Sequence, residues 1–510
     1  MQAKSKTIAK NTLFLSLRML FLLAVNLYTS RVLLENLGIN DFGIYNVVGG
    51  IVTMFSIISG SITASIVRYI TFEMGLDDSM KLKKVFSTSV IVQLFLSAMV
   101  FLLLETIGLW FLNTQMNIDP ERMHAANWVF QFSIVTFIVN LISVPYNALI
   151  IAHEKMSAFA YISIFDGISK FTIAYIIAFS IIDRLVIYSF LLCILSLIVR
   201  VIYTVYCNKN FAESKILWHI DFAFLKSMCG FAGWNFIGAS AGLLRDQGGN
   251  IILNIFFGPS VNASRAIAYQ VSAAVQGFVS SFTTSLNPQI TKSYASGDSE
   301  YLNELLFKGS KFSFYILFLF SFPLWISADY ILTLWLGKVP EYSIVFVRLV
   351  LILSLIETIS MPLITAMLAT GSIKKYQIIV GGLNFLNLPM SLLCLWLGAI
   401  PESVFLIAII LSFCCLFARI ILLKSMINLQ VSRFFKDVLL AIFKVVILCV
   451  SLMWVITTYV SHNSFNGLIL TTLFSIVIIL SVVFSLGLTK SERTNICSFT
   501  RTFLSRLKLM

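Results

Sequence analysis

The chain has 510 residues, of which 59% are hydrophobic and 12% are charged. Soluble domains have about 45–50% apolar and about 25% charged residues, so this composition excludes an ordinary soluble globular protein. The apolar residues form long charge-free runs, and several runs exceed the roughly 20 residues that a helix needs to cross a bilayer. The composition therefore predicts an all-α membrane protein that crosses the bilayer many times.

The charge balance is basic, with 36 Lys and Arg residues against 23 Asp and Glu residues. Most of the excess falls in short connections between apolar runs, where basic residues keep a connection on the cytoplasmic side. No basic run is interleaved with aromatic residues, so we expect no nucleic-acid partner. The eight cysteines lack CxxC or metal-ligand spacing, which argues against disulfides and structural zinc.

Fourteen apolar segments separated by polar breaks predict fourteen spanning helices. They cover residues 11–33, 42–70, 85–112, 124–151, 157–181, 185–206, 223–256, 260–288, 309–333, 343–370, 376–398, 402–424, 438–460 and 465–488. The basic N-terminal residues 1–10 and the apolar segment 11–33 are followed by no small-residue cleavage site. Residues 11–33 are therefore predicted to be an uncleaved first span and not a signal peptide.

The basic residues of the connections predict the orientation in the membrane. If alternate connections are assigned to the cytoplasm, this set holds 23 Lys and Arg residues, and the outer set holds only Arg122, Arg184 and Lys338. Both termini are therefore predicted to be cytoplasmic. No connection exceeds about 25 residues, so a catalytic domain of ordinary size does not fit outside the membrane.

The chain also repeats itself with an offset near 220 residues. The corresponding residues are Gly38 and Gly258, Gly75 and Gly297, Trp110 and Trp335, Pro145 and Pro362, and Arg200 and Arg419. The repeat predicts two six-helix lobes at residues 1–206 and 223–424, joined by a cytoplasmic linker at 207–222. Two further helices at 425–488 and a basic cytoplasmic tail at 489–510 follow. Parallel repeats of this kind place a substrate cavity between the lobes, which indicates a transporter.

No catalytic motif accompanies this architecture. The phosphate loop GxxxxGK[ST], the metal site HExxH and the nucleophile elbow GxSxG are all absent from the sequence. We therefore expect no enzyme activity, no cofactor and no metal site. Active transport would have to draw on an ion gradient, the membrane potential or a substrate gradient.

The candidate site residues are ionisable side chains inside spans, because each costs at least ~2.5–3.5 kcal/mol at a helix centre without water or a partner. Arg18 lies well inside the first span, Arg31 and Arg68 lie nearer the ends of the first two spans, and Arg265 begins the eighth. Each arginine is interpreted either as an anchor that reaches the headgroups or as part of a cationic cavity.

Two pairs of charged residues stand inside later spans. Asp166 and Lys170 have the i, i+4 spacing that places them on one helix face, either as a structural pair or as cavity lining. Arg245 and Asp246 are adjacent and do not share a face, so we expect them to have different partners. Residues 247–250 read Gln-Gly-Gly-Asn, which predicts a bent or broken helix that lines a cavity.

Glu357 lies near the middle of the tenth span without a basic residue one turn away. Such a carboxylate is protonated, paired with another helix or part of an ion relay, which makes Glu357, Asp166 and Asp246 the candidates for ion coupling. Basic residues nevertheless outnumber acidic ones inside the spans, so a cavity that they line would attract an anion. Guanidinium groups suit phosphate oxygens, and an anionic lipid headgroup or a diphosphate is the predicted ligand.

The whole chain resembles the multidrug/oligosaccharidyl-lipid/polysaccharide exporter (MOP) superfamily, and within it the Wzx-type polysaccharide or O-antigen flippases. The resemblance rests on the plan of six, six and two spans and on loose signatures. These are Ser30–Gly38 (SRVLLENLG), Asp41–Gly50 (DFGIYNVVGG), Val144–Glu154 (VPYNALIIAHE), Asn254–Pro259 (NIFFGP) and Asn262–Gln270 (NASRAIAYQ).

The resemblance implies two lobes in a V that alternate access to the two sides of a bacterial inner membrane. It implies movement of an undecaprenyl-diphosphate-linked oligosaccharide, a repeat unit for lipopolysaccharide or other polysaccharide biosynthesis, from the cytoplasmic to the periplasmic leaflet. The related lipid II flippases need arginines in helices 1 and 8 and have an acid after helix 1, which Arg18, Arg265 and Asp41 match. Membrane lipid, a polysaccharide polymerase and a chain-length regulator are the other expected partners.

Two other functions stay open from the sequence. A cation-coupled multidrug antiporter of the same superfamily would share the fold but have a cavity dominated by carboxylates and aromatic residues, which the basic excess disfavours. A membrane glycosyltransferase or polysaccharide polymerase generally has a large loop outside the membrane, and this chain has none.

Overall fold

A computed structural model describes residues 2–54, 56–76, 78–114, 118–215, 217, 221–257, 259–336, 339–459 and 464–494, except for some side chains within the helices. These residues are helical almost throughout, and no strand occurs among them. Ten of the described helical stretches are long and apolar enough to cross a membrane. Each of the fourteen predicted spans falls on a helix, so the prediction of an all-α multi-pass membrane protein is confirmed.

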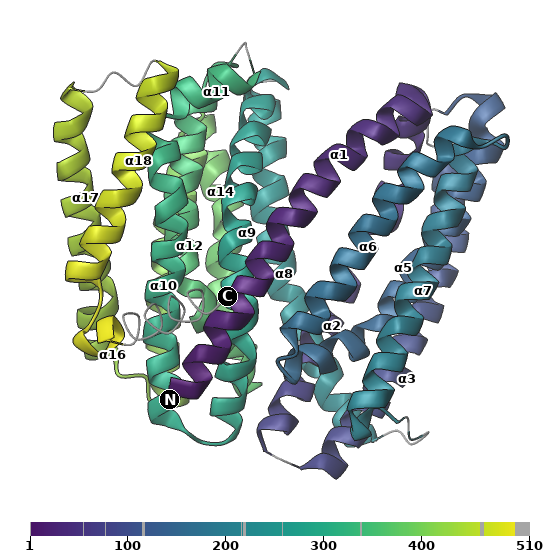
Figure 1. Cartoon of the computed structure of the whole chain (residues 1–510), viewed down its shortest axis with the longest axis horizontal. Coiled ribbons are helices and arrows are strands. Elements are labelled where there is room, and N and C mark those ends of the chain that lie inside the picture. The colour runs from purple at the N-terminus through teal and green to yellow at the C-terminus, as the bar shows by residue number, and fades with distance from the viewer. Residues whose placement is uncertain are drawn as a thin grey trace, which may run out of the picture. The chain divides into compact units, whose positions relative to one another are not determined.

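The chain divides into two compact units. The N-terminal unit comprises Lys10–Ala239 and Thr291–Gly297, and the C-terminal unit comprises Met1–Ala9, Ser240–Ile290 and Asp298–Met510. The first half of the chain forms α1 (Gln2–Met54), α2 (Ser56–Gly75), α3 (Ser79–Leu103), α4 (Leu109–Thr114), α5 (Pro120–Ala152), α6 (Met156–Ile176) and α7 (Arg184–Asn210). The second half forms α8 (Phe222–Phe257), α9 (Pro259–Ala295), α10 (Ser299–Ile326), α11 (Ala328–Leu336), α12 (Ser343–Thr370), α13 (Lys374–Tyr376), α14 (Gly382–Trp396), α15 (Ser403–Ile427), α16 (Val431–Phe434), α17 (Leu440–Tyr459) and α18 (Phe465–Val482), as Figure 1 shows.

Gly38 divides the long α1 into two helical segments. Its φ of 77° and ψ of 170° lie outside the helical region, and a side chain at this φ would be strained. The kink falls between the first two predicted spans. α1 therefore contains the first span and the beginning of the second, and α2 completes the second.

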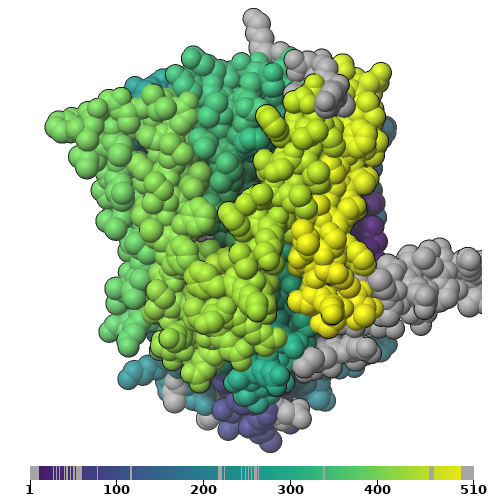
Figure 2. Space-filling view, turned by 90° about the vertical axis from the view of Figure 1, so that its left-hand side faces the viewer, coloured from purple at the N-terminus to yellow at the C-terminus, as the bar shows by residue number. Residues whose placement is uncertain are grey.

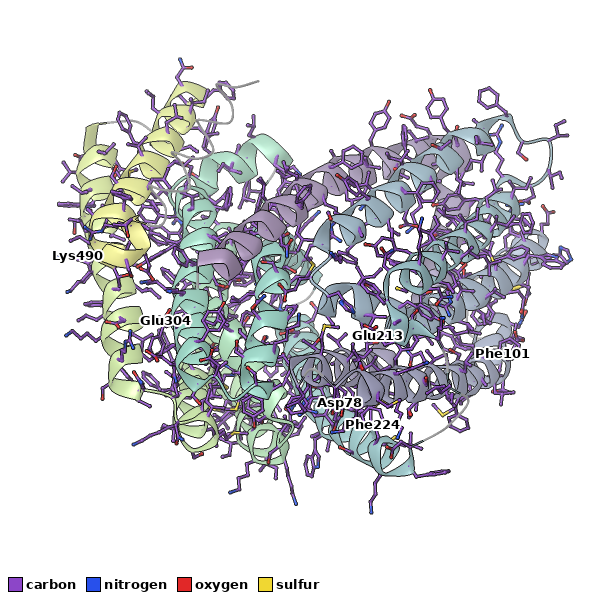
Figure 3. All side chains as sticks on the ribbon, turned by 60° about the horizontal axis from the view of Figure 1, so that its bottom comes forward. Asp78, Phe101, Glu213, Phe224, Glu304 and Lys490 are labelled. Carbon is purple, nitrogen blue, oxygen red and sulfur yellow. The ribbon has the colours of Figure 1, made fainter. Side chains whose placement is uncertain are left out.

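An aspartate caps the N-terminus of the helix that begins the third span of each half of the chain. Asp78 Oδ1 accepts a hydrogen bond from the Lys81 N–H (3.0 Å) at the start of α3, where Figure 3 labels it. Asp298 Oδ1 accepts one from the Tyr301 N–H (3.1 Å) at the start of α10. Each carboxylate satisfies a free N–H of the first turn. The two caps are 220 residues apart, as the internal repeat predicts.

The helices that form the fourth and sixth spans of each half also pack against each other. In the first half these are α5 and α7, and in the second half they are α12 and α15. Both α5 and α12 carry an internal proline, Pro145 and Pro362. An arginine of the sixth helix contacts the fourth beside this proline: Arg200 lies 4.1 Å from the centre of the Tyr146 ring, and Arg419 donates to Ser360 Oγ (3.1 Å). This pairing supports the predicted repeat.

The end of α9 returns to the N-terminal unit and packs against the turn after α2. A Cβ at Gly75 would lie 2.7 Å from the Ala295 Cβ and 2.9 Å from the Lys292 Cα, so this approach requires glycine. Lys292 Nζ also forms an ion pair with Glu154 Oε1 (2.8 Å). The last turn of α9 is therefore held by both packing and charge.

The two additional helices, α17 and α18, lie side by side in the C-terminal unit, where α18 packs against α10 (Figure 1). The residues that follow α18 are docked on the same helix. Lys311 Nζ of α10 lies 2.7 Å from Glu492 Oε2, and both side chains are buried, with 3% and 6% of their surface exposed. The Tyr315 hydroxyl donates to the Gly487 carbonyl (3.3 Å). The first residues of the predicted basic tail thus anchor the additional helices.

We expect Lys311→Met to destabilise the protein by about 3–5 kcal/mol, because it leaves the Glu492 carboxylate buried without a counter-charge. The double variant Lys311→Met/Glu492→Leu should recover most of this loss, since neither charge then remains buried. The apparent Tm of the purified variants in detergent measures both effects.

Lys308→Met is the matched control, because Lys308 forms a more exposed i, i+4 pair with Glu304 (2.8 Å). Its effect should stay below about 1 kcal/mol. Equal shifts in the apparent Tm for Lys311→Met and Lys308→Met would show that the buried pair does not anchor the segment after α18.

Candidate functional site

The N-terminal unit encloses a polar cavity of about 570 Å³ between α1, α5, α6 and α7. We call it the polar cavity. Its polar lining residues are Arg18, Asn26, Tyr45, Thr136, Asn140, Ser143, Asn147, Ser163, Asp166, Lys170, Ser196 and Tyr203. This volume is within the range of about 300–1,000 Å³ that is typical of sites for small ligands.

Arg18 projects from α1 into the polar cavity. Its Nη1 donates to Ser163 Oγ of α6 (3.2 Å), and its guanidinium lies 4.7 Å from the centre of the Phe159 ring. These two contacts fix the side chain but leave donors unused. Arg18 Nε is buried and has no hydrogen-bond partner among the described residues. The prediction that Arg18 lies within reach of a cavity agrees with this position.

Asp166 and Lys170 line the same cavity from α6. Lys170 Nζ lies 2.6 Å from Asp166 Oδ2, so the two interpretations of this pair hold together: the residues neutralise each other and also line the cavity. With this pair neutral, Arg18 leaves the lining with one net positive charge. Among the described residues, no group of three His, Cys, Asp or Glu side chains is placed to hold a metal ion.

The C-terminal unit holds the second set of predicted residues. Arg245 Nη1 lies 2.6 Å from Glu357 Oε1 of α12, and Arg245 Nε lies 3.0 Å from Asp246 Oδ1. The expectation that Arg245 and Asp246 have different partners is wrong, because the long arginine side chain bends back to its neighbour. For Glu357, the structure selects the ion pair with another helix from the three states that the sequence left open.

Arg265 of α9 contacts α8 beside this ion pair. Its Nη2 donates to the Asp246 carbonyl (2.8 Å) and to the Tyr269 hydroxyl (3.3 Å), and only 8% of its surface is exposed. It is therefore not an exposed headgroup anchor. A Cβ at Gly249 would lie 3.3 Å from Arg265 Nη2, so this glycine makes room for the guanidinium.

The predicted break in the seventh span does not occur. α8 is helical without interruption from Phe222 to Phe257, through residues 247–250. The two glycines of this segment are used for close packing: a Cβ at Gly248 would lie 2.1 Å from the Leu388 Cδ1, and Gly249 faces Arg265. Small residues let neighbouring helices approach closely inside a membrane, and helix geometry does not have to break for that.

Other predicted residues lie away from the polar cavity. Arg68 stacks on aromatic rings, with its guanidinium 4.3 Å from the centre of Tyr69, 5.1 Å from Phe72 and 5.3 Å from Phe231. It does not line the polar cavity. The side chain of Arg31 lies outside the described residues.

Asp41 forms a separate charged cluster near the kink of α1. Arg122 of α5 donates from Nε to Asp41 Oδ1 (2.9 Å) and from Nη1 to Asp183 Oδ2 (2.5 Å). Asp183 precedes α7 and also accepts hydrogen bonds from the first N–H groups of that helix. One arginine thus joins α1, α5 and the start of α7 through two carboxylates, so Asp41 has a structural role in addition to the predicted role in ion coupling.

Sequence reasoning missed the polar residues of α5. Thr136, Asn140, Ser143 and Asn147 line the polar cavity at spacings of four, three and four residues, which places them on one helix face. Buried atoms of Thr136 and Asn147 have no hydrogen-bond partner among the described residues. The signal was present as a polar stripe in the fourth span, but the search was restricted to charged residues.

The chain is similar to known proteins in sequence and in fold. The sequence profile of the family described as "Polysaccharide biosynthesis protein" matches residues 8–294, more than half of the chain. No curated relative matches the chain by sequence.

Solved structures share the fold at low identity. A multidrug resistance MATE family transporter of the MOP superfamily, in an outward-facing conformation, has a TM-score of 0.70 and 12% identity, over 84% of this chain and 96% of its own. The Vibrio cholerae MATE transporter VcmN has a TM-score of 0.70 and 15% identity, over 85% and 99%. The MATE transporter ClbM in complex with Rb⁺ has a TM-score of 0.67 and 13% identity, over 81% and 94%. These structures show a shared fold, and the match to the polysaccharide biosynthesis family confirms the family resemblance that the sequence suggested.

The Asp183 carboxyl makes a testable contribution to stability. Burial alone would raise its pKa, but the hydrogen bonds from Arg122 and from the N–H groups of Val186 and Leu185 outweigh burial and lower the pKa of Asp183. Its stabilisation is therefore complete above the ordinary value of about 3.9 and is lost as the pH falls through the lower value in the folded protein.

We expect the difference in Tm between the wild type and Asp183→Asn to be constant from about pH 6 to 8 and to shrink below about pH 4. Thermal unfolding across this pH range measures the difference. Asp329→Asn is the control, because Asp329 is exposed at the start of α11. A difference for Asp183→Asn that persists unchanged at the acid end would contradict the role of the ionised carboxylate.

Proposed function

The chain belongs to the family of polysaccharide biosynthesis proteins, and from this membership we propose that it is a flippase for an undecaprenyl-diphosphate-linked oligosaccharide. The substrate is the repeat unit of an O-antigen, a capsule or an exopolysaccharide. It moves from the cytoplasmic to the periplasmic leaflet by alternating access. The fold shared with transporters of the MOP superfamily supports this class of function.

The observation that carries the proposal is the polar cavity with Arg18 in its wall. Polar side chains that far inside apolar helices are costly unless they meet water or a ligand. The lining combines one net positive charge with amide, hydroxyl and tyrosine groups. This combination suits a substrate that has a phosphate group and sugar hydroxyls, and it does not suit an apolar cation.

Arg18 is the residue that we assign to the diphosphate. The hydrogen bond to Ser163 and the contact with Phe159 hold its guanidinium, and its Nε is available to a ligand. Planar guanidinium groups donate to phosphate oxygens through two parallel hydrogen bonds. The amides of Asn140 and Asn147 are assigned to sugar hydroxyls. The polyprenyl tail stays in the surrounding lipid.

Arg265 is the second candidate for the diphosphate, and Lys170 and Arg245 are further cationic candidates. Arg265 Nε has no hydrogen-bond partner among the described residues. The carboxylates of Asp166, Asp246 and Glu357 are candidates for ion coupling. A proton that binds to one of them would release its ion-pair partner, which gives such coupling a physical basis.

The competing function is a cation-coupled multidrug antiporter, because one structure with this fold is described as a multidrug resistance transporter. A cation-binding cavity needs an excess of carboxylate. The polar cavity has the opposite balance, since its single carboxylate, Asp166, is paired with Lys170. This balance favours the flippase. A glycosyltransferase or polymerase is disfavoured by the membership of the family and by the short connections between the spans.

The proposed setting is the inner membrane of a bacterium, with both termini in the cytoplasm. The basic connections support this orientation. A polysaccharide polymerase and a chain-length regulator are the proposed protein partners, since the flipped repeat unit has to be joined to others.

The test uses liposomes that contain the purified protein and a polyprenyl-diphosphate oligosaccharide in both leaflets. An impermeant sugar-modifying reagent should modify only the outer half without flipping and nearly all of the substrate with the wild type. Modification of the inner-leaflet half requires flipping. Arg18→Ala should slow this part of the reaction by about 10- to 100-fold, because a hydrogen bond to a charged group contributes about 1.5–3 kcal/mol.

Arg348→Gln is the control, because Arg348 donates to the Trp325 carbonyl (3.2 Å) and does not line the polar cavity. Normal flipping by Arg18→Ala/Arg265→Ala would contradict the proposed diphosphate site. A wild type that stalls at the one-leaflet plateau under an imposed ion gradient would favour the antiporter, and efflux of cationic dyes would then be measured.

A further inference from the structure

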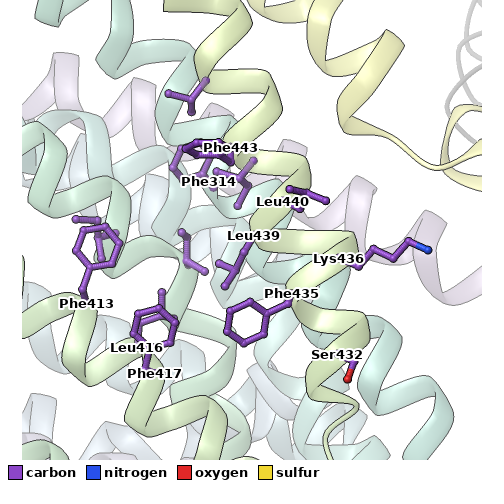
Figure 4. A pocket seen from close by; sticks show the side chains of 14 residues that line it. Phe314, Phe413, Leu416, Phe417, Ser432, Phe435, Lys436, Leu439, Leu440 and Phe443 are labelled. Carbon is purple, nitrogen blue, oxygen red and sulfur yellow. The ribbon is translucent and has the colours of Figure 1, made fainter.

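An apolar groove opens on the C-terminal unit, between α15 and the segment 431–446. We call it the apolar groove. It has a volume of about 690 Å³, and α10 and α12 form its floor with residues such as Phe314 and Ile359. Phe413 and Phe417 of α15 face Phe435 and Phe443 across it (Figure 4). The face of the unit that carries α17 is hollowed in the space-filling view (Figure 2).

Aromatic and buried aliphatic side chains form the walls of the groove. The rings of Phe417 and Phe435 stack at one end, with centroids 6.1 Å apart and an angle of 18° between their planes. The buried Leu416 and Ile442 close the inner wall. A space of this kind inside a membrane is filled by hydrocarbon, since water has almost no polar partners in it.

The rim of the groove is basic. Residues 424–444 contain four basic residues, Lys424, Arg433, Lys436 and Lys444, and one acidic residue, Asp437. Arg433 forms an ion pair with Asp437, with Arg433 Nε 3.2 Å from Asp437 Oδ2. The three lysines have exposed side chains, and no ion pair joins them to another described residue. The rim therefore carries an excess of positive charge.

One of these lysines, Lys436, lines the groove, and Lys444 follows one helical turn after Leu440, which also lines it. Lys436 lines it together with Ser432, and its ammonium group points away from the phenylalanine rings towards the surroundings (Figure 4). Lys444 follows eight residues later, roughly 12 Å further along the helix at 1.5 Å per residue. Side chains of a helix lean towards its N-terminal end, so Lys444 leans back towards Lys436.

Lys444 forms no ion pair with any of the residues that the structure describes. It lies inside the thirteenth predicted span and is exposed on the outside of the unit. A lysine at such a depth reaches for the headgroup layer or for an anion. Lys436 lies in the helical turn just before α17, and this end of α17 is predicted to be cytoplasmic, where basic segments attract anionic lipids.

We propose that the apolar groove is a binding site for an anionic phospholipid of the cytoplasmic leaflet. One acyl chain lies in the groove between Phe413, Phe417 and Phe443, and the phosphate lies at the rim, where Lys436 and Lys444 contact it. The hydroxyl of Ser432 donates to the headgroup. The bound lipid is a structural ligand of the C-terminal unit, separate from the transported substrate, so the inference does not depend on the proposed function.

The test measures lipid retention by the full-length protein. Purified protein in a mild detergent is incubated with equal amounts of phosphatidylglycerol and phosphatidylcholine that have the same acyl chains, and retained lipid is identified by native mass spectrometry. The wild type should retain phosphatidylglycerol in preference. Lys436→Gln and Lys444→Gln should each reduce this preference about fivefold, the factor that corresponds to the attraction of ~1 kcal/mol per lysine.

Two further variants separate the parts of the site. Val446→Trp fills the groove and should reduce the retention of both lipids, since Val446 lines the acyl-chain position. Lys375→Gln/Lys490→Gln is the matched control, because both lysines are exposed and neither lines the groove. It should leave the preference unchanged. Size-exclusion profiles of all variants confirm that they are folded.

Four results would overturn the proposal. The first is equal retention of the two phospholipids by the wild type, and the second is an equal loss of preference in the control variant. The third is displacement of phosphatidylglycerol by an equal amount of a short-chain polyprenyl diphosphate, which would assign the groove to the substrate. A dimer without retained lipid would assign the groove to a second copy of the chain and also overturn the proposal.

Discussion

A charge inside a bilayer must find water, an opposite charge or an aromatic face, and this constraint organises the protein. Lys170 is paired with Asp166, Arg245 with Glu357, and Lys311 with Glu492, the last pair almost completely buried. Separating such a pair would leave a charge in a medium of low dielectric constant, at a cost of several kcal/mol. The pairs Arg245–Glu357 and Lys311–Glu492 join different helical segments and therefore add to the apolar packing that any helix bundle shares.

Several arginines also meet this constraint through contacts with aromatic rings and backbone carbonyls. Arg68 and Arg200 stack on tyrosine, and Arg265 combines the Tyr269 ring with the carbonyl of Asp246. Such contacts hold the charge without neutralising it. The positive charge is therefore still available, and the polar cavity keeps the charge of Arg18 in this way. A diphosphate would bring the missing counter-charge with it.

Local patterns predicted the fold well, because they depend on local physics. Backbone groups in lipid have to be satisfied within the segment, so an apolar run of sufficient length is a helix. The internal repeat was also visible, and the caps at Asp78 and Asp298, 220 residues apart, are consistent with an offset near 220. The prediction of a break at residues 247–250 was wrong for a related reason. Glycine permits a break in a helix, but here Gly248 and Gly249 allow close packing against Leu388 and Arg265. Composition alone does not distinguish these two uses.

The site was predicted in part. Sequence reasoning selected Arg18, Asp166 and Lys170, which do line one cavity, and the i, i+4 spacing predicted the pair that the last two form. It did not select the asparagines of α5, whose cost in a membrane is smaller and whose signal is a stripe of neutral polar residues. It placed Asp41 with an ion-coupling role and did not foresee its contact with Arg122, which lies 81 residues away.

By itself, the sequence determined the helical class, the number of predicted spans, the basic excess in the connections and the short length of those connections. These properties follow from composition and from the spacing of residues along one helix. Only the tertiary structure decided which charges pair between distant segments, because Arg245 and Glu357 are 112 residues apart and Lys311 and Glu492 are 181 apart. Coulomb attraction depends on distance in space, and helix packing alone sets that distance.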